Sequence, residues 1–482
     1  MHGDFSLNPL TYRDRVTRVL YQMGRVQLDS DANEQTESTL RFLRGLAQDV
    51  IGYHGGADDA FRIAPDDLKN PADKLRIQWG EYYVDGIRCV NMPDAGFWEI
   101  MADPEQIKNG KLPSGPLISE HADSYLTPDL RNAKESQLVY LAVWERHISS
   151  SENDAIREVA LNGPDTASRA VVVWQIRIAP SKDIFDAAQQ LRKILDLPMP
   201  GEQRPAGAMK LDPVYLALNL RFRSRARLQA SAKENQKMEA CAISPEARYR
   251  GSENRLFRVE VHRGGTPDQA TFKWSEDNGA IVYPVREIKG KQVYLESLGR
   301  DERTAIRKND WVEVVDDKVT LTRQVNPLLK VIDVDRHRMT VTLSAEPANN
   351  AGSDKKLNPI LRRWAEDARK IVEKTDPDLG ESGVKVHFSS AAPPTVYDKL
   401  NPPIDAYRPG DYWLIPARIA LGNVIWPGGP DKPDPLPPHG VEEHYAPLAL
   451  WNMAAATATD KWEDYRWQFE TLANPVTPLS KP

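Results

Sequence analysis

The chain has 482 residues, which is more than one ordinary hydrophobic core accommodates, so three or four domains are expected. Its net charge of −6 is mild for this length and argues against a dedicated nucleic-acid-binding protein. The 37 prolines interrupt helices and strand ladders alike, and they favour a mainly β, loop-rich protein.

Sorting signals and cysteines point to a protein that is made and folded in the cytoplasm. The first residues are charged and lack the apolar core of a signal peptide, and no run of 18 apolar residues predicts a membrane span. The two cysteines, Cys89 and Cys241, are far apart in sequence and indicate neither a disulfide framework nor a metal site. Any release from the cell is expected to use a route other than the standard export signal.

Two helices are expected in residues 1–60. In residues 11–26, apolar residues recur every three or four positions between arginines, which predicts an amphipathic helix with a basic outer face. The next segment has an apolar stripe over residues 40–51, a cap at residues 29–31, and a stop at Gly52 or at the Gly55-Gly56 pair. Together the two segments predict an α-helical hairpin.

Residues 61–200 are predicted to form a β domain. A hairpin is expected at residues 75–91, around an Asp-Gly pair that is typical of tight turns. Residues 137–149 and 168–178 predict two strands whose near-continuous apolar sequences indicate burial on both faces. A short helix is expected at residues 184–197.

An arginine-rich segment lies in the next predicted domain, residues 201–300. In residues 216–228, apolar residues alternate with arginines, which predicts a strand with one arginine-lined face. The arginines of this face are Arg221, Arg223, Arg225 and Arg227. Residues 210–263 carry twelve Lys or Arg against six Asp or Glu, a net charge of 12 − 6 = +6 within an acidic chain.

This arginine stripe is open to three interpretations. It can follow the phosphates of a nucleic acid, pair with acidic strands of the same chain, or bind an acidic surface on a neighbouring subunit. No aromatic residues that could stack on bases accompany the arginines on their face of the strand. An interface within or between subunits is therefore favoured over nucleic acid.

The same domain contains the most strongly patterned part of the chain. Residues 257–262 alternate apolar with charged or polar side chains, which predicts a strand with one buried face. Two further strands are expected at residues 272–274 and 281–285, joined by the Asn278-Gly279 turn. The three strands predict a β meander that serves as a scaffold.

Short strands continue beyond this meander. Five of them within residues 293–343, one at residues 319–322, predict a small barrel of the SH3 or OB type, placed at residues 301–346. A Pro-rich C-terminal region, residues 347–482, is expected to hold a helix at residues 360–373, short strands and an aromatic tail. The overall prediction is a multidomain, mainly β protein with an N-terminal α-helical hairpin.

Two motifs look at first like metal sites. Asp29, Asp31 and Asn33 match the start of a calcium-binding EF-hand loop, but its glycine and final glutamate are missing, so helix capping is favoured. His439 and His444 are spaced wrongly for a zinc-protease helix, and a loop contact is favoured over a zinc site with a distant third ligand. No nucleophile-elbow, phosphate-loop or dinucleotide motif occurs, so no enzyme, cofactor or metal is predicted.

Three pairs of segments stand out in the sequence. They are GDFS with GRVQLDSDANEQ near the start, YRGSENRLFRVEVH with FKWSEDNGAIVYPV in the centre, and GDYWLIPAR with PPHGVEEHYAPLAL near the end. In these segments, which occur in this order over nearly the whole length, the chain resembles a family of bacterial proteins. The family is encoded among the baseplate and tail genes of contractile, phage-tail-like injection systems.

The resemblance implies a structural component at or around the baseplate or spike, such as a peripheral layer, cage or fibre-like subunit. Its expected partners are other baseplate, tail and spike proteins and further copies of itself in a symmetric assembly, without nucleic acid or a membrane span. Such particles assemble in the cytoplasm and are then membrane-associated or released. The alternative is a polysaccharide-binding or polysaccharide-degrading module of a phage-like particle, with the barrel and the aromatic tail as a sugar platform.

Overall fold

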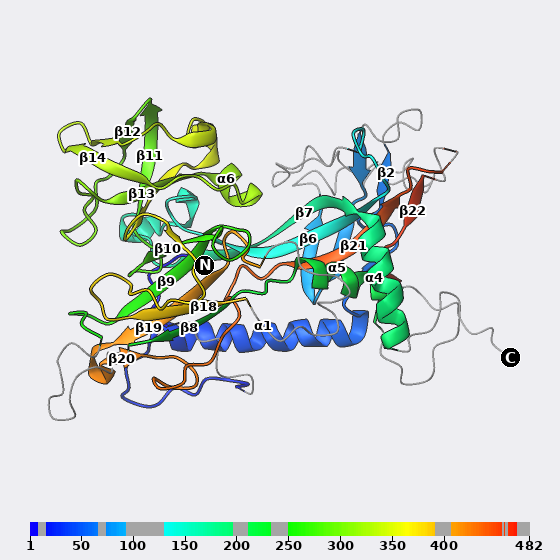
Figure 1. Cartoon of the computed structure of the whole chain (residues 1–482), viewed down its shortest axis with the longest axis horizontal. Helices are drawn as coiled ribbons and strands as arrows, with labels where there is room; N and C mark the ends of the chain where they lie inside the picture. Colours follow the sequence, from blue (N-terminus) through cyan, green and yellow to red (C-terminus); the bar gives the residue numbers. More distant parts are fainter. Residues whose placement is uncertain are drawn as a thin grey trace.

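The protein is multidomain and mainly β, as the sequence predicts. The computed structural model describes residues 1–7, 16–65, 74–92, 130–195, 211–232, 249–390, 406–455, 457 and 461–469. Figure 1 shows three groups of strands and one long helix, α1 (Asp29–Ile51), which runs along one side of the molecule.

Six antiparallel strands close a small β-barrel in the order β11-β12-β15-β14-β13-β16. The barrel strands are β11 (Val282–Lys289), β12 (Gln292–Leu295), β13 (Trp311–Val315), β14 (Leu329–Asp335), β15 (Thr340–Leu343) and β16 (Ile360–Trp364). Buried aliphatic side chains such as Val293, Val331 and Val341 fill its interior. The predicted small barrel is therefore confirmed, and it includes strands on both sides of residues 301–346.

Two elements of the barrel region differ from the predictions. Residues 319–322 are not a strand but lie in helix α6 (Asp317–Thr322), because Asp316 accepts a hydrogen bond from the first turn at 2.8 Å and caps the helix. The helix predicted at residues 360–373 is also wrong, since β16 and then β17 (Arg369–Lys370) occupy this range. Strand β16 is a buried, mostly apolar run, and periodicity does not separate helix from strand in so short a segment.

A second group of strands forms a five-stranded sheet with β9 (Arg255–Arg263) at its centre, in the order β17-β10-β9-β19-β20. Its remaining strands are β10 (Thr271–Ser275), β19 (Tyr412–Arg418) and β20 (Asn423–Val424). One face packs on a two-stranded pair, β8 (Arg227–Ser231) and β18 (Lys385–Ser389). Large aromatic side chains, among them Phe257, Phe388 and Trp413, fill the space between the two layers.

The predicted three-strand meander is wrong in the placement of its third strand. Strands β9 and β10 do pair antiparallel, but β11 pairs with β12 and β16 of the barrel and not with β10. Asn278 and Gly279 have positive φ angles of 50° and 62°, as a tight turn of this type requires. The turn therefore leads the chain out of the central sheet and into the barrel.

A third group is the sheet with the order β22-β21-β6-β7. Its strands are β6 (Gln137–Ile148), β7 (Arg169–Pro180), β21 (His444–Trp451) and β22 (Trp462–Asp464). Helices α4 (Ser181–Ile194) and α5 (Pro213–Phe222) cover one face, and a second sheet covers the other. Strand β6 is buried on both faces, as its apolar sequence predicts.

That second sheet has the order β23-β1-β4-β5. Its strands are β1 (His54–Ala57), β4 (Gly80–Val84), β5 (Ile87–Asn91) and β23 (Gln468–Phe469). The Asp85-Gly86 turn joins β4 to β5, so the predicted hairpin is confirmed. The smaller elements are β2 (Ile63–Pro65), β3 (Leu75–Ile77) and the 3-10 helices η3 (Asp154–Ile156), η4 (Val159–Leu161), η6 (Ala348–Asn350), η7 (Lys355–Leu357) and η8 (Ile419–Leu421).

The α-helical hairpin predicted for the N-terminal region is wrong in the described part of the chain. Helix α1 is present, but it begins at Asp29 with Leu28 in the N-cap position, one residue before the predicted cap. Asp31 still contributes to the helix start, because it accepts a hydrogen bond from the Leu28 amide at 3.3 Å. Residues 16–28 are not helical, whereas residues 8–15 lie outside the described residues. Gly24 has a φ angle of +72°, which a right-handed helix does not allow.

Candidate functional site

The arginine stripe predicted for residues 216–228 does not form a strand. Asp212 accepts a hydrogen bond from the Val214 amide at 2.8 Å, and Pro213 takes the first helical position, where its missing N–H costs nothing. Helix α5 therefore occupies the first half of the segment, and β8 begins only at Arg227.

The change of secondary structure separates the four arginines. Arg221 lies in the last turn of α5 and pairs with Asp183 of α4 at 3.2 Å. Arg223 is exposed directly after the helix, Arg225 is half-buried in the connecting segment, and Arg227 donates to a neighbouring backbone carbonyl at 2.8 Å. Arg221 thus pairs within the chain, and the interface role of the set stays a prediction.

Strand β9 carries a dense group of charged side chains in the interior. The sequence predicts one buried face for this strand, but the structure buries both, including Arg258, Glu260 and His262. The polar face lies beneath the first residues of the chain and the barrel strands β13 and β16. A charged residue at alternate strand positions normally indicates a solvent-facing side chain, so the sequence gives no signal for this cover.

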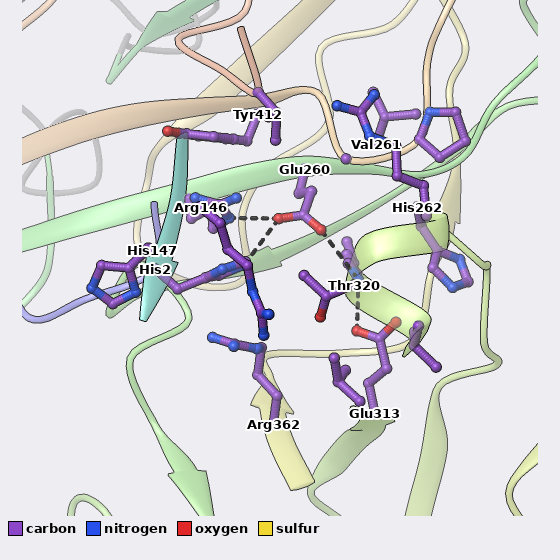
Figure 2. A pocket seen from close by; sticks show the side chains of 18 of the residues that line it. His2, Arg146, His147, Glu260, Val261, His262, Glu313, Thr320, Arg362 and Tyr412 are labelled. Atoms are coloured by element: carbon purple, nitrogen blue, oxygen red, sulfur yellow. Dashed lines mark hydrogen bonds and ion pairs between the residues drawn. The ribbon is translucent and has the colours of Figure 1, made fainter. Parts of the chain in front are cut away.

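Glu260 is the centre of the contacts on this face (Figure 2). It accepts a hydrogen bond from Arg258 Nε at 2.6 Å and pairs with His2 at 3.2 Å and with Lys273 at 3.3 Å. Burial raises the pKa of a carboxyl, but Arg258 and Lys273 outweigh burial and hold the pKa of Glu260 well below its ordinary value. Glu260 is therefore a fixed anion that is paired within the chain.

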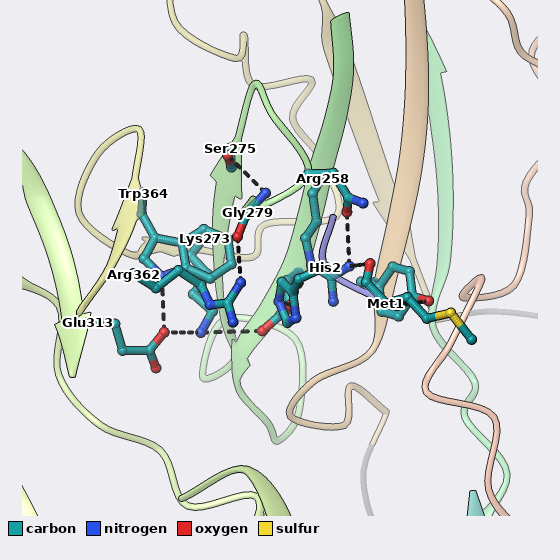
Figure 3. A network of polar contacts seen from close by, with 12 residues as sticks. Met1, His2, Arg258, Lys273, Ser275, Gly279, Glu313, Arg362 and Trp364 are labelled. Carbon is teal, nitrogen blue, oxygen red and sulfur yellow. Dashed lines mark hydrogen bonds and ion pairs between the residues drawn. The ribbon is translucent and has the colours of Figure 1, made fainter. Parts of the chain in front are cut away.

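Lys273 and Glu313 join the central sheet to the barrel. Lys273 Nζ lies 2.6 Å from Glu313 Oε2, and the same oxygen accepts a hydrogen bond from Trp364 Nε1 at 3.0 Å. The ammonium group also lies over the Trp364 ring, 4.4 Å from its centroid. Because these residues belong to β10, β13 and β16, their contacts fix the barrel on the sheet (Figure 3).

The first residues of the chain complete this group. The Met1 carbonyl accepts a hydrogen bond from Arg258 at 3.0 Å, and the Gly3 carbonyl accepts one from Asn278 Nδ2 at 2.9 Å. The side-chain oxygen of Asn278 in turn accepts from Arg258 at 3.3 Å. The turn that leads into the barrel therefore also holds the N-terminal residues against β9.

A second buried carboxylate, Glu443, is surrounded by three arginines. Its side chain lies 2.6 Å from Arg408, 3.2 Å from Arg177 and 3.0 Å from Arg323, the last as an ion pair without hydrogen-bond alignment. Burial raises the pKa of a carboxyl, but Arg323, Arg177 and Arg408 outweigh burial and hold the pKa of Glu443 well below its ordinary value.

The three arginines around Glu443 come from all three groups of strands. Arg177 belongs to β7, Arg323 follows α6 in the barrel, and Arg408 precedes β19 of the central sheet. Glu443 thus connects the three units at one point. We call the residues around the two carboxylates the junction cluster: Arg177, Arg258, Glu260, Lys273, Glu313, Arg323, Arg408 and Glu443.

A cavity of about 170 Å³ lies at this junction (Figure 2). Strand β6 contributes Arg146 and His147 to its lining, the barrel contributes Glu313 and Arg362, and the central sheet contributes Glu260. Most of these side chains are charged. The arrangement can hold a polar or charged group, and it also keeps the three units in fixed positions.

The two histidines that were weighed as a zinc pair make separate contacts. His439 Nδ1 accepts a hydrogen bond from the Leu414 amide at 3.0 Å, and burial lowers the pKa of His439 to about 4. His444 pairs with Asp85 at 2.7 Å; burial lowers its pKa, but the hydrogen bond with Asp85 and the negative charges of Asp85 and Glu442 together outweigh burial and raise it. Within the described ranges, no three His, Cys, Asp or Glu side chains are grouped to hold a metal ion.

The remaining predictions concern the two cysteines and the aromatic residues near the C-terminal end of the described chain. Cys89 is buried in β5, and burial raises the pKa of its thiol, whereas Cys241 lies outside the described residues. In the tail, Trp451 is buried and packs 5.1 Å from the half-buried Trp462 ring, so this pair forms no exposed sugar platform. Among the helices that the structure describes, none is long and apolar enough to cross a membrane.

Comparison with known proteins gives one match. A family model described as a family of unknown function, DUF6519, matches residues 1–210 and 214–459, which is nearly the whole chain. No curated protein and no solved structure matches.

Proposed function

We propose that this chain, which belongs to the family of unknown function DUF6519, is a structural component of a contractile, phage-tail-like injection particle. It acts through protein–protein interfaces at or around the baseplate or spike, as a peripheral layer, cage or fibre-like subunit present in several symmetric copies. The proposal includes no catalytic step and no cofactor. The similarity of the start, centre and end of the sequence to proteins of such particles supports it.

The observation that carries the proposal is the inverted polarity of α1. An amphipathic helix on a folded domain normally turns its apolar side toward the core. Here the buried residues of the helix are polar, Ser30 and Glu34. Four of its large apolar side chains are exposed instead, Phe42 by 70%, Leu43 by 52%, Leu46 by 48% and Val50 by 67%, whereas Leu40 and Ile51 are half-buried.

The exposed apolar residues of α1 recur at intervals of three and four positions. Leu43, Leu46 and Val50 follow the spacing that aligns side chains along one seam of a helix, and Phe42 flanks it. Such a seam normally packs against another element. The helical hairpin predicted from the sequence would supply one, but residues 16–28 are not helical.

The segment before α1 exposes further large apolar side chains. These are Leu20, Tyr21, Met23, Val26 and Leu28. We call residues 16–51 the N-terminal arm. Exposed apolar surface of this kind typically marks a site of protein–protein contact, so the arm is the part of the molecule that we expect a neighbouring subunit to cover.

Polar contacts hold α1 in place without burying its apolar side. The Ser6 amide donates to Asp29 at 2.9 Å near the start of the helix, and Arg44 pairs with Glu145 of β6 at 2.8 Å farther along. A helix that is anchored through its polar side presents its apolar side outward in a fixed position. This is the arrangement expected of a subunit surface that is completed by assembly.

The proposal is tested in the bacterium that produces the protein. We expect the double variant Phe42→Glu/Leu46→Glu to be made and folded but to be missing from purified tail-like particles when these are analysed by mass spectrometry. The matched control is Asn33→Glu, because it adds a negative charge at an exposed polar position of the same helix. Absence of the wild-type chain from purified particles, or equal incorporation of all three proteins, would contradict the proposal.

A further inference from the structure

Helix α1, which runs along one side of the molecule (Figure 1), exposes a regular row of side chains. The exposed residues of this row follow one another at alternating intervals of four and three positions: Ala32, Thr36, Thr39, Leu43, Leu46 and Val50. This is the spacing of the a and d positions of a coiled coil, where one seam of a helix packs against a second helix. So narrow a seam differs from the broad apolar face with which a helix packs on a domain core. The surface therefore fits another helix that lies alongside α1.

The second half of this seam is both apolar and open. Its large apolar residues are Leu43, Leu46 and Val50. Along the first half, the Val19 amide donates a hydrogen bond to Gln35 Oε1 at 2.8 Å, so the segment before α1 already lies beside the helix there. Residues 39–50 are therefore the part of α1 that a second helix can cover.

The charges of α1 decide how a second copy of the same helix would lie. Residues 29–38 contain four acidic and no basic side chains. In a parallel pair these acidic halves would lie side by side and repel each other, whereas an antiparallel pair keeps them at opposite ends. Farther along the helix, Arg41 and Asp49 are both exposed. An antiparallel pair over residues 39–50 brings Arg41 of each copy near Asp49 of the other, so the helix is complementary in charge to an inverted copy of itself.

We propose that α1 packs against α1 of a second copy of this chain, in antiparallel orientation, over residues 39–50. In such a pair a positions face d positions, so Leu43 faces Leu46 of the other copy, and Thr39 faces Val50. A two-fold axis repeats both contacts. So short a contact is weak in dilute solution and forms where symmetric copies are held close together. The inference rests on the proposed function for this setting, because it names the neighbour that covers the arm.

Disulfide trapping in the purified full-length protein tests the pair. Leu43→Cys and Leu46→Cys are made separately, each together with Cys241→Ser, so that the buried Cys89 is the only native thiol. Because the two positions face each other, we expect oxidation of the mixture to give a disulfide-linked dimer, and oxidation of either variant alone to give several-fold less. Both positions are exposed, so we expect the variants to fold.

The matched control uses Asn33→Cys, also with Cys241→Ser, at an exposed position of the same helix outside residues 39–50. Mixed with Leu43→Cys, it is expected to give no more dimer than either variant alone. A dimer yield from this control mixture, or from Leu43→Cys alone, that equals the yield from the mixture with Leu46→Cys overturns the antiparallel pair. Absence of the dimer both in solution and within particles also overturns it.

The same two variants, produced together in the bacterium and oxidised in purified tail-like particles, separate this inference from the proposed function. A disulfide-linked dimer of the chain within the particles supports both. Incorporation of the chain without this dimer, or its linkage to a different protein, overturns the helix pair and leaves the proposed function standing. Absence of the wild-type chain from the particles overturns the proposed function, and the dimer trapped in the purified protein then supports the helix pair by itself.

Discussion

The junction cluster and the N-terminal arm depart from the usual polarity of a folded protein in opposite directions. The cluster buries charged residues, and there each carboxylate is paired within the chain, as Glu443 is with three arginines. The arm exposes apolar residues, and Phe42 and Val50 of α1 are 70% and 67% exposed. The first region completes the fold of one chain, whereas the second is, under the proposed function, the surface that a neighbouring subunit covers.

Buried ion pairs and apolar contacts also differ in what they fix. A buried ion pair contributes little net stability, because the cost of removing two charges from water offsets their attraction. Removing only one partner of a buried ion pair nevertheless lowers stability strongly, because the other charge is then buried without a partner. We infer that the junction cluster sets the relative positions of the three units, whereas the stability of each unit comes from its apolar core.

The largest loss of stability is expected from a substitution at Glu443, which disrupts the junction cluster. Glu443→Gln leaves three buried arginines without their anion, so we expect the free energy of unfolding to fall by about 3–5 kcal/mol, measured by urea denaturation. The matched control is Glu287→Gln, which removes an exposed partner of Lys289 and is expected to cost less than about 1 kcal/mol. A loss at Glu443 no larger than at Glu287 would show that the buried pairs do not hold the units together.

A second prediction concerns the pH dependence of stability and tests the environment of His439. Burial lowers the pKa of His439 to about 4 from its ordinary value of 6.5, so the unfolded state takes up a proton first as the pH falls. The stability that depends on this neutral histidine is complete above pH 6.5 and declines as the pH falls toward about 4. From pH 7.5 to pH 5 this decline amounts to about 2 kcal/mol.

The variant His439→Asn isolates this contribution, because its side-chain oxygen can still accept from the Leu414 amide without titrating. We expect it to lose about 2 kcal/mol less stability than the wild type between pH 7.5 and pH 5, measured by urea denaturation at both values. The exposed His337→Asn serves as the control and is expected to follow the wild type. Identical pH dependence of the His439 variant and the wild type would contradict the assignment.

A third prediction tests how the N-terminal residues dock on the turn that leads into the barrel. A Cβ atom at Gly279 would lie 2.8 Å from His2 Cδ2, and the residue has a φ angle of +62°. At Gly429 the φ angle is +76°, but nothing lies within 4 Å of a Cβ atom. We expect Gly429→Ala to cost about 1 kcal/mol through backbone conformation alone, and Gly279→Ala to cost measurably more in thermal unfolding. Equal losses would show that His2 does not pack on the turn.

The smallest effect on stability is expected in the arm. Leu46 is 48% exposed, so Leu46→Ala should change the free energy of unfolding of the isolated chain by less than about 0.5 kcal/mol. Leu141 of β6 has no exposed surface, and Leu141→Ala should cost about 2–5 kcal/mol in the same denaturation experiment. A large loss at Leu46 in the isolated chain would mean that α1 is already packed, which would remove the main support for an assembly surface.

The sequence predicts much of this fold where pattern and turn chemistry agree. The hairpin at Asp85-Gly86 and the long strands β6 and β7 are present because alternating or continuous apolar residues decide the structure locally. The predictions fail where a helix-capping residue or a pairing partner far away in the sequence determines the secondary structure. Asp212 and Pro213 start a helix in a segment whose alternation favours a strand, and β11 leaves the predicted meander because its partners lie in the barrel.

The candidate site was harder to predict than the fold. Glu260 and Glu443 lie in segments that stand out in the sequence, RVEVH and GVEEH, but their partners are up to hundreds of residues away, as Arg177 is from Glu443. No local pattern indicates that a charged residue is covered by a separate unit. The same limit explains α1, whose apolar stripe correctly predicts a helix but not the direction in which the stripe points.

Hydrogen–deuterium exchange of the chain, free and within purified tail-like particles, tests the central claim most directly. In the free protein, the amides of the junction strands β9 and β16 should exchange slowly, and those of α1 should exchange faster, because α1 lacks apolar packing on its exposed side. On assembly, exchange in residues 36–51 should slow at least about tenfold, while β9 and β16 should not change. Unchanged exchange in α1 within the particle, or protection confined to the junction, would contradict the account.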